Sequence, residues 1–316
     1  MESAAATTVQ AVQTYAPERS VTVEEVAGGL GLNRHQTRLF RRVHGQRLLR
    51  EDPELPLLDL ITPAARAVLR DVDDPDRIRY LIFAHTIQSV APSYLDVAML
   101  AARELGLRRA AAFALTQQNC ATGLAAVDVA GELLRADDEP GALALVLTGE
   151  KTFSRIAQLV ENTSIMGEAA AACLVGLAGA GLRVRSYVVR TYGQHADIFR
   201  PSPASRTEFS DTYVPRLVEV IHECLAEAGV AMADIELIVP HNVNVSSWLR
   251  ALPDLGIDRK QVYLDNVERY GHCFCSDPFV NLATLRAEQR LIPGGRYLLT
   301  SVGLGATYAA MVVENS

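Results

Sequence analysis

The sequence repeats one pattern of segments, and this repeat restricts the possible folds more than any other feature. The strand-like run Ile78–Thr86 in the first half has a counterpart at Ile235–Val243 in the second. Each run follows acidic residues and a segment with helical spacing, and each precedes another helical segment that ends in Leu-Gly. A strand, a polar turn, a long helix and an apolar strand ending in glycine follow in both halves. The polar turn carries Cys120 in the first half and His272 in the second.

This alternation of strands and helices predicts right-handed β-α-β units and a largely parallel sheet. The run Leu143–Leu147 has no charge, as a strand covered on both faces requires. The segment Ala121–Leu134 has few charged residues, so we expect a buried helix there. A duplicated unit with buried central helices predicts an α/β fold, a five-layered α-β-α-β-α sandwich, with residues 1–176 and 177–316 as its two halves.

Cys120 lies where the apolar stretch Ala110–Leu115 gives way to this helix. Unpaired N–H groups and the helix dipole lower the pKa of a thiol at a helix start, and the thiolate is the nucleophilic form. A free cysteine is also often no more than a small buried side chain. Because sites in α/β sheets form beyond the carboxyl ends of strands, we expect Cys120 and His272 to face each other, which favours the nucleophile.

Composition excludes several classes of protein. The 316 residues have a formal net charge of −7, and the basic residues are scattered apart from a short cluster between residues 38 and 47, so nucleic acid is not expected as the main partner. No apolar run approaches the length of a membrane span, and the N-terminus has no signal-peptide pattern. The five cysteines do not suggest a disulfide framework, so we expect the protein in a reducing cytoplasm.

Five segments of the chain, taken together, resemble the thiolase superfamily and, within it, the β-ketoacyl-acyl-carrier-protein synthase III group. Cys120 falls where that family has its acyl-accepting cysteine. His241–Asn244 resembles the family's His-Gln-Ala-Asn pattern, and Tyr270–His272 resembles a Tyr-Gly-Asn segment whose asparagine is catalytic. Ser301–Tyr308 resembles the glycine-rich C-terminal loop, and Met166–Ala171 resembles a Phe-Gly-Asp-Gly-Ala segment. The resemblance implies a thiolase-like fold and an acyl-transferring enzyme.

The resemblance also implies roles for individual residues. Cys120 would take an acyl group from an acyl-CoA or acyl-carrier-protein thioester, with no other cofactor. Backbone N–H groups of Cys120 and Leu304 would stabilise the oxyanion, and Gly303 and Gly305 would shape that loop. His241 would stabilise an enolate formed from malonyl-carrier protein, or act as general base toward an alcohol or amine.

His272 is the main departure, because the family has asparagine there. A second imidazole N–H could replace the amide donor and permit decarboxylative condensation, but some relatives altered at this position transfer the acyl group to an alcohol or amine. We therefore favour transfer to oxygen, nitrogen or sulfur in a specialised biosynthetic pathway, with condensation and a catalytically silent partner subunit as alternatives. Asn244 is expected to support His241, while Asp277, which precedes a proline, either caps a helix or orients His272.

Substrate delivery has weaker signals in the sequence. Arg38 and Arg155 are candidates for contact with a pantetheine phosphate or an acidic carrier protein, and the sole tryptophan, Trp248, is a further candidate for substrate binding. The CoA-using relatives have a tryptophan in their N-terminal region that this chain lacks, which favours a carrier-protein donor. The Cys273-Phe-Cys275 spacing is too short for the usual zinc pairing, so no metal is expected. The resemblance also implies a homodimer.

Overall fold

The computed structural model describes residues 5–137, 139–197 and 202–316, and its centre is a nine-stranded sheet. The strands of the first half are β1 (Thr8–Tyr15), β4 (Ile78–Ala84), β5 (Ala111–Leu115), β6 (Leu143–Gly149) and β9 (Ala170–Gly176). Those of the second half are β10 (Leu182–Thr191), β11 (Ile235–Pro240), β12 (Arg296–Gly303) and β13 (Thr307–Asn315). Their order across the sheet is β11-β12-β13-β10-β1-β9-β6-β4-β5.

The strand order confirms the duplication. The strands of the two halves correspond in pairs, β1 with β10, β4 with β11, β6 with β12 and β9 with β13, and β5 has no counterpart in the second half. In each half β6 or β12 lies between β4 or β11 and β9 or β13, and β9 or β13 pairs antiparallel with β1 or β10. The halves join through the pairs Thr8 with Arg183 and Val9 with Leu182, at the ends of β1 and β10. The predicted division after residue 176 falls at the end of β9.

One predicted strand of the second half is reduced to a single bridge, between Ile238 and Val262. The residues available for it lie between a 3₁₀ turn (Arg259–Gln261) and α9 (Asp265–Tyr270), so the extended stretch is too short for a ladder. The backbone N–H of Tyr263 donates to the carbonyl of Ile238 at 2.9 Å, which keeps the vestige of the strand in its expected place.

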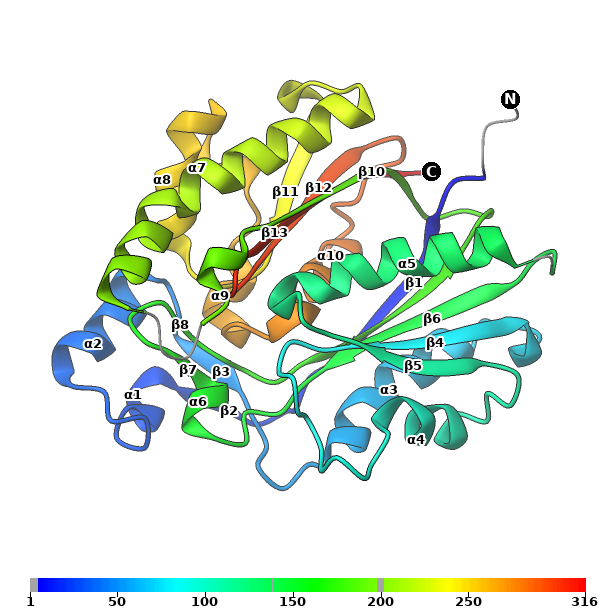
Figure 1. Ribbon diagram of the computed structural model, residues 1–316, viewed down its shortest axis with the longest axis horizontal. Helices are drawn as coiled ribbons and strands as arrows, with labels where there is room; N and C mark the ends of the chain where they lie inside the picture. Colours follow the sequence, from blue (N-terminus) through cyan, green and yellow to red (C-terminus); the bar gives the residue numbers. More distant parts are fainter. Residues whose placement is uncertain (1–4, 138, 198–201) are drawn as a thin grey trace.

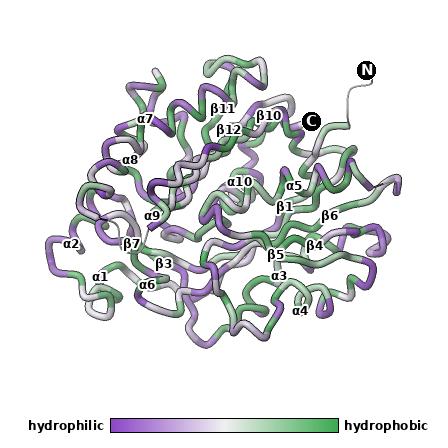
Figure 2. Tube along the Cα trace, in the orientation of Figure 1, coloured by the Kyte–Doolittle hydropathy of each residue, from purple (hydrophilic) through white to green (hydrophobic). Residues whose placement is uncertain are grey.

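Helices complete five layers, which confirms the predicted sandwich (Figure 1). On one outer face, α3 (Leu57–Leu69) and α4 (Val97–Glu104) pack against β4, β6 and β9. On the other, α7 (Pro203–Ala228) and α8 (Val245–Leu255) pack against the strands of the second half. Between the first-half strands and the second-half strands of this sheet lie α5 (Thr122–Ala136) and α10 (Asp277–Ala287), which share one core with strands of both halves. Figure 2 shows hydrophobic colouring along β4, β5 and β6 and hydrophilic colouring around α2 at the rim.

A glycine at the start of α5 allows the two middle helices to approach closely. A Cβ atom at Gly123 would lie 2.5 Å from the carbonyl oxygen of Cys275 and 3.0 Å from the ring of Phe279. Neither a backbone carbonyl nor a buried ring can move away at low cost, so only glycine fits here. The contact brings the turn before α5 against the turn before α10, and these are the two turns that carry Cys120 and His272.

The remaining elements cover the end of the sandwich where β4, β6, β11 and β12 finish. They comprise β2 (Ser20–Thr22), α1 (Val23–Ala27), α2 (Arg34–Arg38), a π-helical turn (Leu39–Val43), β3 (Leu48–Arg50), α6 (Arg155–Gln158), β7 (Leu159–Val160) and β8 (Ser164–Ile165). In the described part of the chain, none of the helices has the length and apolar character that crossing a membrane would require.

Candidate active site

Cys120 lies in a 3₁₀ turn, Asn119–Ala121, directly before α5, as predicted. Two hydrogen bonds hold this turn against the end of β12 and the loop after it. The Ser301 hydroxyl donates to the carbonyl of Cys120 at 2.6 Å, and the side-chain amide of Asn119 donates to the carbonyl of Leu304. Asn119 has a left-handed backbone with φ of 50°, which asparagine tolerates better than most residues. The thiol is 6% exposed, so a substrate must reach it through a cavity.

The structure brings His272 against Cys120, with 3.2 Å between Nε2 and Sγ. The backbone of His272 is held from both sides by one segment: its N–H donates to the carbonyl of Ile165 at 3.2 Å, and its carbonyl accepts from Gly167 at 2.9 Å. The imidazole is 2% exposed. Its position is therefore set by the fold and not by a mobile surface loop.

The Asp277 carboxylate lies on the other side of the His272 ring. Its Oδ2 is 2.5 Å from Nδ1 of His272. The backbone N–H groups of Asn242 and Cys273 donate to the carboxylate at 2.5 and 2.7 Å, and the Asn242 amide adds a bond at 3.2 Å. The cap of α10 is Ser276, so of the two roles considered for Asp277 the geometry supports the orientation of His272. Because a carboxylate accepts, Nδ1 carries a proton and Nε2 faces Sγ.

The charges around His272 favour its protonated form. Burial by itself would lower the pKa of His272, but the negative charges of Asp277 and of the Cys120 thiolate, with their hydrogen bonds, raise it to about 10. An imidazolium at this position supplies the positive charge that a thiolate at Sγ would pair with. The arrangement Asp277–His272–Cys120 has the geometry of a nucleophile, a base and an orienting acid.

His241 lies at the end of β11, where its backbone N–H donates to the carbonyl of Thr300 at 2.9 Å. Its ring centroid is 5.8 Å from that of His272, and its Nε2 is 3.5 Å from the hydroxyl of Tyr213. Burial, followed by the charge on His272, lowers the pKa of His241 to about 3. The two histidines therefore differ in charge at neutral pH, with His241 neutral.

The glycine-rich loop between β12 and β13 lies against the nucleophile turn. A Cβ atom at Gly303 would lie 1.9 Å from the carbonyl oxygen of Gln118, so the loop needs glycine there. Gly305 has φ of 120°, a conformation that side chains rarely adopt. Leu304 is not among the residues with positive φ, which explains why a leucine is tolerated where the family has glycine.

Cys120, His272, His241 and Tyr213 line a cavity of about 290 Å³. Its lining combines the polar groups with apolar side chains from six stretches of the chain: Ile87, Ile156, Ala157, Val160, Met166, Phe209, Val243, Phe274, Val302 and Leu304. Among the described lining residues there is no lysine, arginine, aspartate or glutamate. The site therefore suits a mostly apolar ligand that presents a carbonyl to Cys120.

Three predicted site residues lie elsewhere. The Asn244 side chain caps α8 by accepting from Ser247 at 2.8 Å and donates to the carbonyl of Thr163 at 3.2 Å, so it braces the cavity wall and not His241. Arg38 is exposed on α2, and Arg155 donates to the carbonyl of Leu30 at 3.0 Å and pairs with a surface glutamate. Neither arginine lines the described cavity, so the structure does not place them at the site where they were expected to contact substrate.

Trp248 was predicted as a substrate contact, and the structure corrects this. The side chain is 2% exposed in the core between α7, α8 and the second-half strands, because the apolar face of α8 must be covered. We expect Trp248→Ala to lower the free energy of unfolding by about 3–5 kcal/mol in urea denaturation. A loss below about 1 kcal/mol would contradict the core assignment.

Sequence analysis missed Tyr213, Asn242 and Glu150. The Glu150 carboxylate is buried at the end of β6 and accepts from the backbone N–H groups of Thr86 and Ile87 at 2.8 and 2.6 Å, which holds one wall of the cavity. Burial raises the pKa of Glu150 to about 7. A charged residue directly after an uncharged buried strand was the signal that could have identified it.

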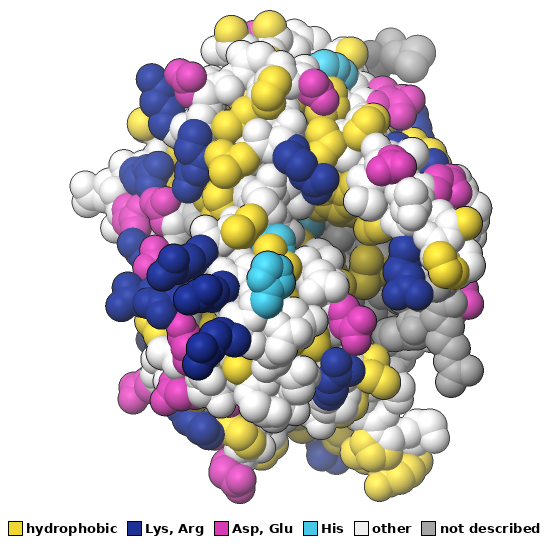
Figure 3. Space-filling model, turned by 90° about the vertical axis from the view of Figure 1, so that its left-hand side faces the viewer, with side chains coloured by type: hydrophobic (Ala, Val, Ile, Leu, Met, Phe, Trp, Pro, Cys, Tyr) yellow, Lys and Arg dark blue, Asp and Glu magenta, His cyan; other side chains and the backbone are white. Residues whose placement is uncertain are grey.

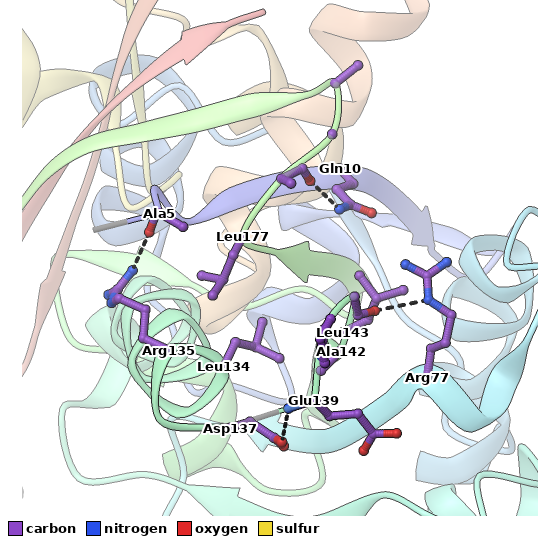
Figure 4. A pocket seen from close by; sticks show the side chains of 15 residues that line it. Ala5, Gln10, Arg77, Leu134, Arg135, Asp137, Glu139, Ala142, Leu143 and Leu177 are labelled. Atoms are coloured by element: carbon purple, nitrogen blue, oxygen red, sulfur yellow. Dashed lines mark hydrogen bonds between the residues drawn. The ribbon is translucent and has the colours of Figure 1, made fainter. Parts of the chain in front are cut away.

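A larger cavity, of about 870 Å³, lies at the opposite end of α5, near the first residues of β6 (Figure 4). Its polar side chains are occupied by the adjacent backbone: Arg77 donates to Gly141, Gln10 to Ala178 and Arg135 to Ala5. No cysteine, histidine, serine or tyrosine is among the described residues that line it. Although this cavity is larger, its described lining offers no thiol, hydroxyl or imidazole group, so it is not the candidate active site.

A basic face lies over α1, α2 and the π-helical turn, where Arg34, Arg38, Arg41 and Arg42 border one depression. Figure 3 shows lysine and arginine side chains gathered on the corresponding side of the molecule. Arg41 pairs with Glu24 at 2.6 Å, so part of this charge is compensated. The rest is available to an anionic partner.

Comparison with known proteins shows that the chain is similar to β-ketoacyl synthases III. Residues 225–315 match the C-terminal domain of 3-oxoacyl-[acyl-carrier-protein] synthase III. β-Ketoacyl-[acyl-carrier-protein] synthase III of Lactobacillus delbrueckii subsp. bulgaricus is 27% identical over 275 residues, which cover 81% of this chain and 83% of that protein. The acetoacetyl CoA synthase NphT7 of Streptomyces sp. strain CL190 is 27% identical over 334 residues, covering 95% and 96%.

Solved structures show the same fold over almost the whole chain. The acyltransferase ChlB3 superposes with a TM-score of 0.84 at 21% identity and covers 98% of both chains. The synthase III of Pseudomonas aeruginosa PAO1 superposes with a TM-score of 0.80 at 20% identity and also covers 98% of both. The thiolase-like architecture expected from the sequence is thereby confirmed.

Proposed function

Because the chain is a thiolase-superfamily protein of the β-ketoacyl synthase III type, we propose that it is an acyltransferase that works through an acyl-Cys120 intermediate. The observation that carries this proposal is the continuous hydrogen-bonded set Cys120–His272–Asp277. A nucleophile with a base that a third group orients is the arrangement that covalent acyl transfer requires. Two sequential half-reactions follow from it, as in a ping-pong mechanism.

In the first half-reaction, the Cys120 thiolate attacks the carbonyl carbon of an acyl thioester. A C–S bond to Cys120 forms, and the bond to the donor's sulfur breaks. The departing thiolate takes the Nε2 proton of His272, so the imidazole becomes neutral while Asp277 keeps Nδ1 protonated. Backbone N–H groups near Cys120 and Leu304 are assigned to the tetrahedral oxyanion, and one thioester replaces another without a cofactor.

In the second half-reaction, the neutral His272 presents a lone pair at Nε2. A hydroxyl, amine or thiol gives its proton to this lone pair as it attacks the acyl carbon, and Cys120 leaves as the thiolate. The asparagine of the related synthases can donate an N–H but cannot take a proton. This difference favours transfer to oxygen, nitrogen or sulfur over formation of a carbon–carbon bond.

The alternative is decarboxylative condensation with malonyl-carrier protein. His241 and a still protonated His272 would then donate to the enolate that forms as carbon dioxide leaves. The two reactions differ in one product, so acyl-loaded enzyme would be mixed with malonyl-carrier protein and released carbon dioxide measured. Release of carbon dioxide together with a lengthened acyl chain would reject transfer to oxygen, nitrogen or sulfur as the main activity.

The experiment that tests the proposal itself is intact-protein mass spectrometry after incubation with a panel of acyl-CoA and acyl-carrier-protein thioesters. We expect a mass gain equal to one acyl group, mapped to the peptide that contains Cys120. A third reading, a catalytically silent thiolase-fold subunit, predicts no adduct and a thiol that resists iodoacetamide. The basic face over α1 and α2 favours a carrier protein as donor, because carrier proteins present acidic surfaces.

We further propose a cytoplasmic homodimer in specialised biosynthesis, with halves that divide after residue 176. The apolar strand β5 is at the edge of the sheet, where it has one neighbour. The nearby Tyr94 and Met99 are 83% and 55% exposed, as expected for side chains that a second subunit covers. Analytical ultracentrifugation tests this assembly, and a monomer would reject it.

The raised pKa of His272 predicts how stability depends on pH. Its folded-state pKa of about 10 exceeds the ordinary value of 6.5, so the pair with Asp277 contributes fully to stability below that ordinary value. The contribution is lost as the pH rises through about 10. We expect the free energy of unfolding in urea to fall across this range more for the wild type than for His272→Asn, and parallel declines would contradict the assignment.

A further inference from the structure

Tyr213 lines the cavity beside His241, and the acylation of Cys120 described above does not use it. Its hydroxyl is 3.5 Å from Nε2 of His241. Its ring is held between two others, with centroid distances of 5.7 Å to Phe209 and 6.0 Å to Tyr308. The aromatic neighbours on α7 and β13 therefore set the direction of the hydroxyl.

Tyr213 and His241 are both neutral groups. Burial raises the pKa of Tyr213 far above its ordinary range, and burial lowers the pKa of His241 to about 3. A separation of 3.5 Å is long for a hydrogen bond between oxygen and nitrogen, so both groups retain capacity for a ligand. A phenol that donates and an imidazole that accepts together match a ligand group that does both, such as a hydroxyl or an uncharged amine.

The cavity itself excludes charged ligands. Its described lining contains no lysine, arginine, aspartate or glutamate, and in the acyl enzyme His272 is the neutral base of the proposed second half-reaction, with Asp277 bonded to its Nδ1. An ionised ligand would lose its hydration here without gaining a counter-ion, which is costly. With a volume of about 290 Å³, the cavity has room for about ten non-hydrogen atoms, taking about 30 Å³ for each.

We propose that Tyr213 and His241 form the binding site for the acyl acceptor, and that this acceptor is a small uncharged molecule with a hydroxyl or amine group. The inference rests on the proposed function, because it concerns the second half-reaction. Tyr213 contributes binding and orientation, while His272 takes the acceptor's proton. The acyl carbon on Cys120 then lies between the acceptor group and the oxyanion donors.

The test uses enzyme that a thioester has acylated on Cys120 and that is freed of excess donor. Discharge is followed by mass spectrometry with benzyl alcohol and with 4-(hydroxymethyl)benzoate, which has the same hydroxyl and an added carboxylate. We expect the alcohol to discharge the acyl enzyme at least about tenfold faster than the carboxylate does. For Tyr213→Phe we expect the half-saturating concentration of benzyl alcohol to rise about tenfold relative to the wild type.

Tyr192→Phe is the matched control. This hydroxyl lies 3.4 Å from the surface residue Glu219 and does not line the described cavity, so its removal should leave discharge unchanged. Equal discharge by the two probes, an unaltered half-saturating concentration in Tyr213→Phe, or no discharge by benzyl alcohol would overturn the inference. Failure of Cys120 to become acylated would instead reject the proposed function, so the two failures are distinguishable.

Discussion

Replacing Cys120 by alanine is expected to abolish formation of the acyl enzyme and to lower turnover by at least about a thousandfold. The nucleophile is the only atom that bonds to the acyl group in the proposed first half-reaction, and the neighbouring thiols are directed elsewhere. Cys275 donates to the carbonyl of Ala84 at 3.4 Å, and Cys273 lies with its sulfur 3.9 Å from the carbonyl of Tyr270. Neither can replace Sγ of Cys120 without rearrangement of the turn.

Measurement is by intact mass after incubation with the thioester that loads the wild type. Cys173→Ala is the control, because Cys173 is a core residue of β9 and burial raises its pKa, which makes it unreactive. That variant should acylate like the wild type. If Cys120→Ala still gained one acyl mass, the nucleophile assignment and the proposed mechanism would both be wrong.

Asp277→Asn is expected to lower the rate of acyl transfer by roughly a hundredfold to ten-thousandfold with little change in fold. The asparagine amide can donate to Nδ1 of His272, which moves the ring proton to Nε2 and removes the lone pair from the side that faces Sγ. The one oxygen that remains can still accept from Cys273. The loss should therefore reflect the wrong tautomer and not an unfolded site.

A positioning role has a signature besides the rate. In the wild type, Asp277 raises the pKa of His272, so the pH profile of acylation in Asp277→Asn should shift to lower pH. Asp128→Asn is the matched control, because Asp128 is a half-buried carboxylate of α5 whose charged neighbours are Glu132, Arg135 and Glu227. A variant at residue 277 with wild-type rate and pH profile would show that His272 acts without its acid.

The duplication, the layers and the positions of the turns that carry Cys120 and His272 were predictable because each depends on a pattern local in the sequence. The third strand expected in the second half was wrong because a 3₁₀ turn (Arg259–Gln261) and α9 (Asp265–Tyr270) leave three extended residues between them. Trp248 was wrongly assigned to substrate binding. Nothing in the sequence distinguishes an aromatic side chain that lines a cavity from one that is buried in the core, as Trp248 is. Its helix, α8, packs on the outer face of the second-half strands.

The rest of the site depends on contacts between distant parts of the chain. Tyr213 and His241 are 28 positions apart, and Glu150 and Thr86 are 64 apart. No spacing rule connects such pairs, because their distance is set by how helices and strands pack. From the sequence, Asp277 could either cap a helix or orient His272. The structure favours the second role because the carboxylate lies against Nδ1 of the His272 ring.

The contact between Gly123 and Cys275 joins side chains that the two halves of the chain supply separately. In the proposed mechanism the nucleophile, Cys120, belongs to the first copy of the repeat, while His272 and Asp277 belong to the second, and this contact sets the two turns against each other. Neither copy alone holds all three side chains, so the proposed catalysis depends on the contact between the two copies. Expressed as separate fragments, the halves would be inert apart and active only when reassembled, which makes turnover a direct readout of their association.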